Sequence, residues 1–225
     1  MNIYLDIETV PTNSQKVREK IAETIKAPAQ YKKPESIEQW MVENKESAIA
    51  DQLAKTSFDG AYGHIVCIGI AIDDQKAISY QAPSLDYEKS VIEMAFGYLS
   101  NVVGFDTYSG SLERKSVFIG HNIANFDLRF LFKRAVVLGI KPPSFIPFHA
   151  KPWDSSIYDT MDKWDSQNRN SLAKLCDVLG IPVKSGMDGS MVADYYAQGR
   201  IDEIAEYCRE DVEATRSVYK RMTFQ

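Results

Sequence analysis

The sequence has little cysteine, and what it has is scattered. Only three cysteines occur among its 225 residues, Cys67, Cys176 and Cys208, and none of them forms a Cys-x-x-Cys pair. This odd and sparse set argues against a disulfide framework and against a structural zinc site. It is typical of reduced thiols, so we expect a cytoplasmic protein.

Long apolar runs are also missing. No stretch approaches the roughly 18 apolar residues that a membrane-spanning helix needs, so we expect no membrane association. The N-terminus lacks a basic region followed by an apolar one, and we expect no signal peptide. There is no internal repeat and no low-complexity tract, and we expect residues 1–225 to form a single domain.

An excess of positive charge is absent too, because the net charge is -5. Nothing global therefore indicates a nucleic-acid-binding protein. An acidic protein can still bind a polyanion where its carboxylates gather around metal cations, which reverse the local field. The overall charge thus decides little about the ligand.

The hydrophobic pattern predicts an α/β domain with a mixed sheet. The expected strands are residues 2–7, 64–72, 76–81, 116–121 and 155–161, the second and third forming a hairpin. The expected helices are residues 87–103, 126–139, a short one that begins at Ser171, 190–197 and 201–222.

A long polar stretch, residues 12–58, separates the first two strands. Apolar residues recur in it near helical spacing, among them Ile37, Trp40 and Ile49. Because an unstructured loop of that length is uncommon in a compact domain, we expect a helical insertion after strand one.

Two acids in the segment LDIET, Asp6 and Glu8, interrupt an otherwise apolar first strand. Side chains alternate between the faces of a strand, so these two point the same way. Taken alone, an Asp-x-Glu pair at a strand end is explained as well by a turn or a cap as by a metal site.

Two later segments also carry acids in unusual places. Asp127 ends GHNIANFD, at the start of a helix that follows a strand, where the macrodipole alone would explain a negative charge. Tyr207 and Asp211 are four residues apart in EYCREDVEA and share one helical face. Clustered carboxylates suit Mg²⁺ or Mn²⁺ and repel one another unless cations neutralise them.

Together, LDIET, GHNIANFD and YCRED resemble the three motifs of the DEDD (DnaQ-like) 3′–5′ exonucleases, which have an RNase H-like fold. Tyr207, four residues before Asp211, is similar to the tyrosine subclass. The spacing from Asn122 to Asp127 resembles the proofreading domain of B-family DNA polymerases and the stand-alone bacterial and phage proteins related to it. The resemblance implies a mixed five-stranded sheet flanked by helices.

The resemblance also implies roles for single residues. Asp6, Glu8, Asp127 and Asp211 would hold two divalent cations, Mg²⁺ or Mn²⁺, and Tyr207 would orient the attacking water.

Five further residues match positions that contact the substrate. Thr9 would contact the terminal nucleotide through its backbone, and Val10 would lie against the sugar or base. Asn122 and Phe126 would lie near the substrate strand. His121 is placed to contact a phosphate, although a strand-end histidine with a hydrogen-bonded partner explains it equally well.

Other residues have weaker signals. Asp188 and Ser190 in GMDGS resemble a loop of the same family, but a plain turn explains them too. Asp154, Asp159 and Asp162 form an acid-rich stretch at mixed spacing, in which one acid could support the site and a surface position explains most of them. The available phosphate-contacting cations are Lys32, Lys33, Arg129, Lys133, Arg134 and Lys184; a solvated helix face is the simpler reading of Arg129 and Lys133.

These features predict a two-metal 3′–5′ exonuclease that releases nucleoside monophosphates from single-stranded or frayed DNA. A 3′–5′ exoribonuclease of the same chemistry is one alternative, because nothing in the sequence reads the 2′-hydroxyl. A non-catalytic nucleic-acid-binding module or polymerase accessory is another. The presence of all four acids and Tyr207 favours catalysis. The sequence does not say whether the protein works alone, as an oligomer or with a protein partner.

Overall fold

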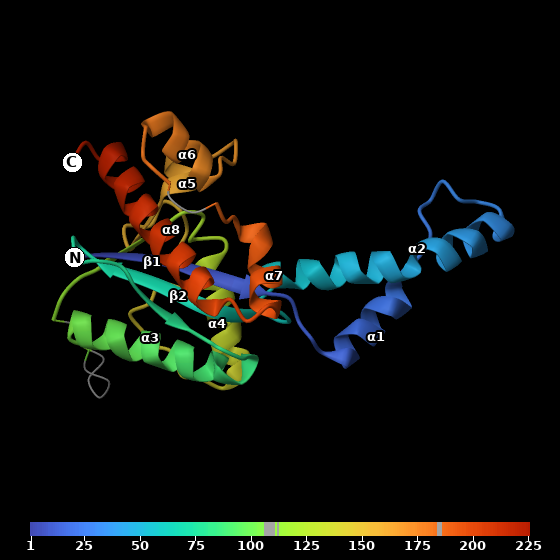
Figure 1. Ribbon diagram of the computed structural model, residues 1–225. Coiled ribbons are helices and arrows are strands. Elements are labelled where there is room, and N and C mark those ends of the chain that lie inside the picture. Colours follow the sequence, from blue (N-terminus) through green and yellow to red (C-terminus); the bar gives the residue numbers. More distant parts are fainter. Residues whose placement is uncertain (106–110, 112, 184–185) are drawn as a thin grey trace.

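The computed structural model describes residues 1–105, 111, 113–183 and 186–225, and so Lys184 lies outside the described residues (Figure 1). Its centre is a five-stranded sheet in the order β3-β2-β1-β4-β5. The strands are β1 (Asn2–Val10), β2 (His64–Ile72), β3 (Ile78–Gln81), β4 (Val117–Gly120) and β5 (Ile157–Asp159). β1 pairs antiparallel with β2 and parallel with β4, so the sheet is mixed, as predicted.

Helices cover both faces of this sheet. α3 (Glu88–Val103) and α4 (Asp127–Leu138) lie on one face, and α8 (Ile201–Met222) crosses the other (Figure 1). The smaller helices are α5 (Thr160–Trp164), α6 (Leu172–Leu179) and α7 (Val192–Ala197). No helix in the described part of the chain is long and apolar enough to cross a membrane.

Alternation along β1 assigns its side chains to two cores. Ile3, Leu5 and Ile7 pack with the helices α3 and α4. Tyr4 and Val10 face the other way and pack with α8. Asp6 and Glu8 have the same parity as Tyr4 and Val10, so they too face α8.

A glycine lets α8 come close to the sheet at this point. Gly69 of β2 is the register partner of Asp6. A Cβ atom at Gly69 would lie 2.9 Å from the Sγ atom of Cys208 and 2.9 Å from a methyl carbon of Val212. The missing side chain therefore brings this part of α8 against the strand that carries the acids.

The expected helical insertion is present and consists of α1 (Gln15–Thr24), α2 (Pro34–Ala54) and the 3-10 turn η1 (Lys55–Phe58). Helices α1 and α2 extend away from the sheet (Figure 1). Ile49 is the one buried residue of α2, so the helical spacing of apolar residues there does not mark a core face.

Element boundaries differ from the predictions where side chains redirect the chain. β1 continues to Val10 rather than ending at residue 7, with a register irregularity between Glu8 and Thr9. The strand expected over 155–161 shrinks to β5, because the carboxylate of Asp159 accepts hydrogen bonds from the amides of Met161 and Asp162 and so starts α5. The predicted bounds of the last helix, 201–222, are confirmed.

A buried ion pair joins α3 to α4. The guanidinium of Arg134 donates to both carboxylate oxygens of Glu88, at 2.7 Å each, and Glu88 also accepts from the amide of Ile65. Arg134 is 3% exposed and Glu88 is 1% exposed. The suggestion that Arg134 is available to a phosphate is therefore wrong, because Glu88 takes its charge inside the core.

Candidate active site

The acids predicted from the three motifs meet at one place in the fold. Asp6 and Glu8 lie on β1, Asp127 begins α4, and Asp211 lies on α8. The negative charges of Asp127 and Asp211 both contribute to raising the pKa of Asp6 and of Glu8, so the four groups interact electrostatically. Segments separated by about 120 and 200 residues of sequence therefore build one acidic centre.

Asp127 is fixed to the free edge of β1. β4 pairs with β1 over Asn2–Tyr4, and among the described residues no strand pairs with the next part of this edge. There the amide of Ile7 donates to the Oδ1 atom of Asp127 at 3.1 Å. Since Ile7 lies between Asp6 and Glu8, this hydrogen bond places the 2%-exposed Asp127 beside the pair.

The α8 side of the centre includes a thiol that sequence reasoning missed. The Sγ atom of Cys208 donates to the Oδ2 atom of Asp6 at 3.6 Å. The ligand atoms of Asp6, Glu8 and Cys208 all lie within 4.8 Å of one another, and the group could hold a metal ion. The available signal was position, because Cys208 follows Tyr207 and precedes Asp211 by three residues on the same helix.

Burial and mutual repulsion govern the electrostatics of the four acids. Burial, reinforced by the neighbouring carboxylates, raises the pKa values of Asp6 and Glu8 well above their usual range. Burial raises the pKa of Asp127 to about 7 and that of Asp211 to about 6. Among the described residues, no lysine or arginine forms an ion pair with any of the four.

This donor set fits hard divalent cations. Carboxylate oxygens are the preferred protein ligands of Mg²⁺ and Mn²⁺, and Asp6 and Glu8 supply them. Burial raises the pKa of the neighbouring Cys208, so its thiol stays protonated and does not compete as a thiolate ligand. A cation between the acids would remove the repulsion that now raises their pKa values. The centre therefore has both the ligands and an electrostatic need for positive charge.

Tyr207 completes the α8 side. Its side chain is half-buried, and it lies on the same face of α8 as Asp211, one helical turn earlier. Burial, followed by the charges of Asp211 and Glu8, raises the pKa of Tyr207 far above its usual range. The phenol therefore stays protonated at neutral pH and remains a hydrogen-bond donor.

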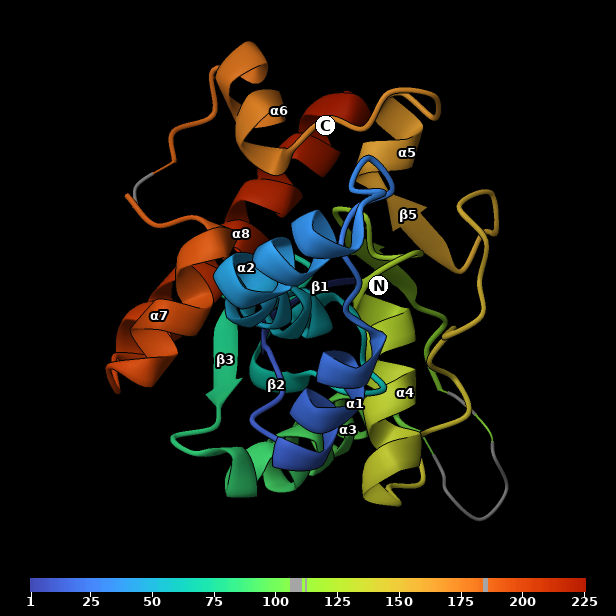
Figure 2. The ribbon, with the colours of Figure 1, turned by 90° about the vertical axis from the view of Figure 1, so that its right-hand side faces the viewer.

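A groove of about 650 Å³ opens beside the acids. Glu8 and Thr9 of β1 form one side of it, and the end of the insertion forms another. Helix α2 leads to this end of the sheet, where α7 also lies (Figure 2). Its further lining residues include Lys55, Ser57, Phe58, Phe126, Gly189 and Ser190. The GMDGS loop thus reaches the groove through Gly189 and Ser190, while the Asp188 carboxylate caps the next turn by accepting from the amide of Ser190.

Of three predicted substrate residues, Thr9, Val10 and Phe126, two line the groove and one is buried in the core. Thr9 and Phe126 line the groove, as a substrate contact requires. Val10 is 4% exposed and packs in the core against α7 and α8. Its side chain is therefore not available to a sugar or base, because β1 continues through Val10 and turns that residue inward.

His121 and Asn122 do not line the groove. The ring nitrogens of His121 lie 2.9 Å from Thr160 Oγ1 and 2.8 Å from the carbonyl oxygen of Asn170, and burial lowers its pKa. Both nitrogens of a neutral ring are thus engaged within the protein, which supports the alternative of a structural histidine. Asn122 has a φ of +65° and donates its amide to Asp159, so the loop before Asp127 is held by that buried acid.

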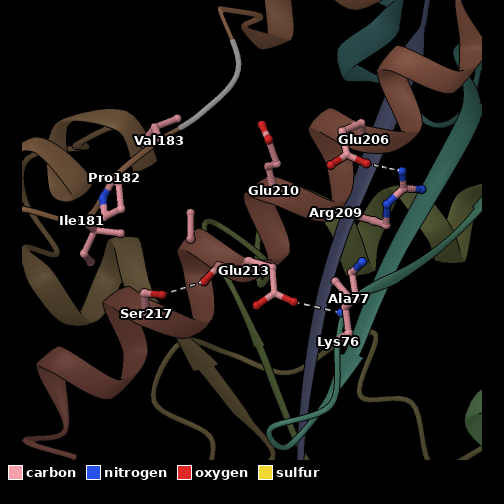
Figure 3. A pocket seen from close by; sticks show the side chains of 11 residues that line it. Lys76, Ala77, Ile181, Pro182, Val183, Glu206, Arg209, Glu210, Glu213 and Ser217 are labelled. Atoms are coloured by element: carbon pink, nitrogen blue, oxygen red, sulfur yellow. Dashed lines mark hydrogen bonds and ion pairs between the residues drawn. The ribbon is translucent and has the colours of Figure 1, made fainter.

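A second hollow, of about 430 Å³, lies along another side of α8 and contains none of the four acids (Figure 3). Glu206 is paired with Arg209 at its rim, and the Glu213 carboxylate accepts from the amide of Ala77 at 2.8 Å. Glu213 and Arg209, which bonds to Ser79, therefore join α8 to the β2–β3 hairpin.

The mixed five-stranded sheet with helices on both faces is an RNase H-like fold, and comparison of sequences identifies a family within this fold class. Residues 63–225 match a family described as predicted 3′–5′ exonucleases related to the exonuclease domain of PolB. The chain belongs to this family. The matched region contains Asp127, Tyr207 and Asp211, whereas Asp6 and Glu8 precede it.

Comparison of structures supports the fold. A family B DNA polymerase from the hyperthermophilic archaeon Pyrobaculum calidifontis is similar over 99% of this chain, with a TM-score of 0.59 and 15% sequence identity. The similarity involves 24% of the polymerase chain, so this protein spans about a quarter of that relative's length. At that identity the likeness shows the fold alone. A search of curated protein sequences finds no match.

Proposed function

We propose that this protein is a metal-dependent 3′–5′ exonuclease that removes nucleoside monophosphates from the 3′ end of single-stranded or frayed DNA. The observation that carries the proposal is the meeting of four acids, from β1, α4 and α8, without a basic partner among the described residues. Membership of a family of predicted 3′–5′ exonucleases supports the reaction type and direction.

In this proposal, Asp6, Glu8, Asp127 and Asp211 hold two divalent cations, Mg²⁺ or Mn²⁺. When bound, such cations activate a water molecule and stabilise the leaving oxygen in phosphodiester hydrolysis. Asp6 and Glu8 supply ligands from a rigid strand, and the hydrogen bond from Ile7 holds Asp127 in place. Preorganised ligands of this kind reduce the cost of assembling the centre during the reaction.

Tyr207 positions the attacking water. Its proton stays on the phenol oxygen, so the hydroxyl can both donate a hydrogen bond and accept one from water. The bond that forms joins the water oxygen to phosphorus, and the bond that breaks joins phosphorus to the 3′ oxygen of the preceding nucleotide.

The groove beside Glu8 receives the terminal nucleotide. Its volume of about 650 Å³ is adequate for one nucleotide. The Thr9 hydroxyl donates to the carbonyl oxygen of Ser57 at 2.7 Å, which leaves the backbone of Thr9 as the part that faces a substrate.

Two alternatives are separated by one experiment. Labelled DNA and RNA oligonucleotides of the same sequence are incubated with Mg²⁺ or Mn²⁺ and the wild-type protein. We expect stepwise shortening from the 3′ end with faster degradation of DNA. Faster degradation of RNA would establish the exoribonuclease instead, and binding without degradation of either would establish a non-catalytic module.

The matched variant is Asp6→Asn, which keeps the shape of the side chain and removes its charge. We expect cleavage to fall at least about 100-fold, as when an essential charge-stabilising group is lost. Its far-ultraviolet circular dichroism should match that of the wild type. Undiminished cleavage by this variant would refute the assignment of the acids.

A further inference from the structure

Phe58 is a large apolar side chain that the fold leaves in solvent at the edge of the candidate active site. It ends η1 and is 73% exposed. Exposing an aromatic ring of this size has a cost in water, and the cost is offset where a ligand covers the ring. What surrounds Phe58 indicates which ligand that is.

One hollow on which Phe58 borders is the groove that contains Glu8 and Thr9. The other has a volume of about 300 Å³ and is lined by Arg129, Lys133 and His149, with Asn125 and several phenylalanines. Phe58 and Phe126 line both hollows, so these two rings separate them. A nucleic-acid strand that leaves the acidic groove across this pair of rings enters the hollow of Arg129 and Lys133.

The hollow of Arg129 and Lys133 has the positively charged side chains that a phosphate backbone requires. Lys133 is half exposed, and Arg129 donates its Nε atom to the carbonyl oxygen of Ala124 at 2.9 Å, which orients the guanidinium. His149 stands against the ring of Phe132, 4.7 Å between ring centroids. Cations combined with aromatic rings are the usual surface for single-stranded nucleic acid.

Several contacts hold the segment on both sides of Phe58. The preceding residues are bonded to β1 and to the residues just after it, by the hydrogen bonds from Thr9 to Ser57 and from the amide of Thr12 to Thr56 Oγ1. The following residue, Asp59, pairs with Lys133 of α4 at 2.6 Å. The ring is therefore presented by a braced segment, which lowers the entropy cost of stacking against it.

We propose that Phe58 is a stacking platform between two nucleotide subsites. The 3′-terminal nucleotide lies in the groove beside Glu8, and the preceding nucleotide lies in the hollow of Arg129 and Lys133, where Lys133 contacts its 5′ phosphate. The inference rests on the proposed exonuclease function. It gives the insertion a role in binding substrate, although the matched family region begins at residue 63, after the insertion.

The first test compares Phe58→Ala with Phe224→Ala. Phe224 is 98% exposed and lies next to the C-terminus, at the opposite end of the molecule from the insertion (Figure 1). Loss of one base–aromatic stack weakens binding by about 5- to 150-fold, so we expect the KM for a ten-nucleotide DNA strand to rise by that factor in Phe58→Ala. Phe224→Ala should match the wild type, and an unchanged KM in Phe58→Ala would overturn the platform.

The second test compares Lys133→Gln with Lys89→Gln. Both lysines form an ion pair with a neighbouring acid, and their side chains are 50% and 51% exposed. Lys133→Gln should raise the KM for the oligonucleotide and lower the salt dependence of log K by about 0.7, the value for one phosphate of a single strand. The KM for the p-nitrophenyl ester of thymidine 5′-monophosphate, which has no preceding nucleotide, should not change. An equal rise with both substrates, or none, would overturn the second subsite.

Failure of the proposed function would give a different result. If the wild type cleaves no oligonucleotide, the exonuclease is refuted, and fluorescence anisotropy with a labelled strand in Ca²⁺ buffer still tests the platform. A weaker dissociation constant for Phe58→Ala than for Phe224→Ala would support stacking without catalysis. Equal constants, including no measurable binding by either, would overturn it.

Discussion

The amide of Ile7 donates a hydrogen bond of 3.1 Å to the carboxylate of Asp127 and thereby joins the first strand to the start of α4. Because Ile7 lies between Asp6 and Glu8, this bond brings a third acid to the pair. Asp127 therefore has two separable properties. Its negative charge can bind a cation, and its carboxylate oxygen accepts the hydrogen bond from the amide of Ile7.

Substitutions at Asp127 should separate these properties. Asp127→Asn keeps an acceptor for the Ile7 amide and removes the charge, so we expect loss of activity. Because burial raises the pKa of Asp127 to about 7, the metal-free Asn variant should also be more stable than the wild type at neutral pH. Asp127→Ala leaves a buried amide unpaired and should be less stable than the Asn variant by about 1–3 kcal/mol. Urea denaturation of the metal-free proteins measures the difference, and equal stabilities would show that the hydrogen bond contributes little.

The raised pKa of Asp211 predicts how stability depends on pH without metal. Its folded value of about 6 exceeds its usual 3.8, so the folded state holds a proton that the unfolded state releases. Ionising the buried Asp211 therefore lowers the free energy of unfolding. This loss is absent below pH ~4, grows as the pH rises and is complete above pH ~6. Metal-free Asp211→Asn should therefore gain up to about 3 kcal/mol relative to wild type between pH 4 and pH 7.

Denaturation in a chelating buffer across that range tests this expectation. Adding Mg²⁺ at pH 7 should stabilise the wild type more than Asp211→Asn, since the cation neutralises the acids. A stability difference that stays constant with pH would contradict the raised pKa.

The buried pair of Glu88 and Arg134 should behave as a unit. Arg134→Met leaves the Glu88 carboxylate buried without its partner and should cost about 3–5 kcal/mol. The double variant Glu88→Gln/Arg134→Met should recover much of that loss. Lys89→Gln, which breaks an exposed pair, should change the free energy of unfolding by less than about 1 kcal/mol. Additive effects of the two core substitutions would argue against the pairing.

Gly69 offers a test of the packing between α8 and the sheet. In Gly69→Ala the new methyl group would lie 2.9 Å from Cys208 Sγ, so α8 must move away from β1. We expect a loss of about 1–3 kcal/mol and a fall in kcat, because Asp211 and Tyr207 move with the helix. Gly97→Ala is the matched control; nothing lies within 4 Å of its Cβ position in α3, and it should stabilise slightly. Full activity in Gly69→Ala would contradict the requirement for close packing.

The sequence predicted the sheet and the meeting of the acids because both follow from strong patterns. Alternation along the first strand made neighbours of Asp6 and Glu8, and the family motifs supplied Asp127 and Asp211. If the predicted strand had been extended past residue 7, the same alternation would have placed the side chain of Val10 in the core. The burial of Arg134 could not be predicted from the sequence, because its partner Glu88 is 46 residues away along the chain.

The groove depended on tertiary placement that no local pattern contains. Phe58 ends a polar insertion, and only the hydrogen bonds of Ser57 and Thr56 to the end of β1 bring it beside Glu8. His121 shows the reverse case, in which a motif residue is used by the fold. Thr160 and Asn170, which engage its ring, follow it by 39 and 49 residues.

The central claim is that the four acids hold divalent cations for hydrolysis of a nucleic-acid 3′ end. Anomalous X-ray diffraction from crystals soaked with Mn²⁺ and a deoxynucleoside 5′-monophosphate tests it most directly. We expect two manganese peaks among the carboxylates of Asp6, Glu8, Asp127 and Asp211, with the nucleotide in the groove beside Phe58. Manganese absent from this centre, or bound only elsewhere, would contradict the claim.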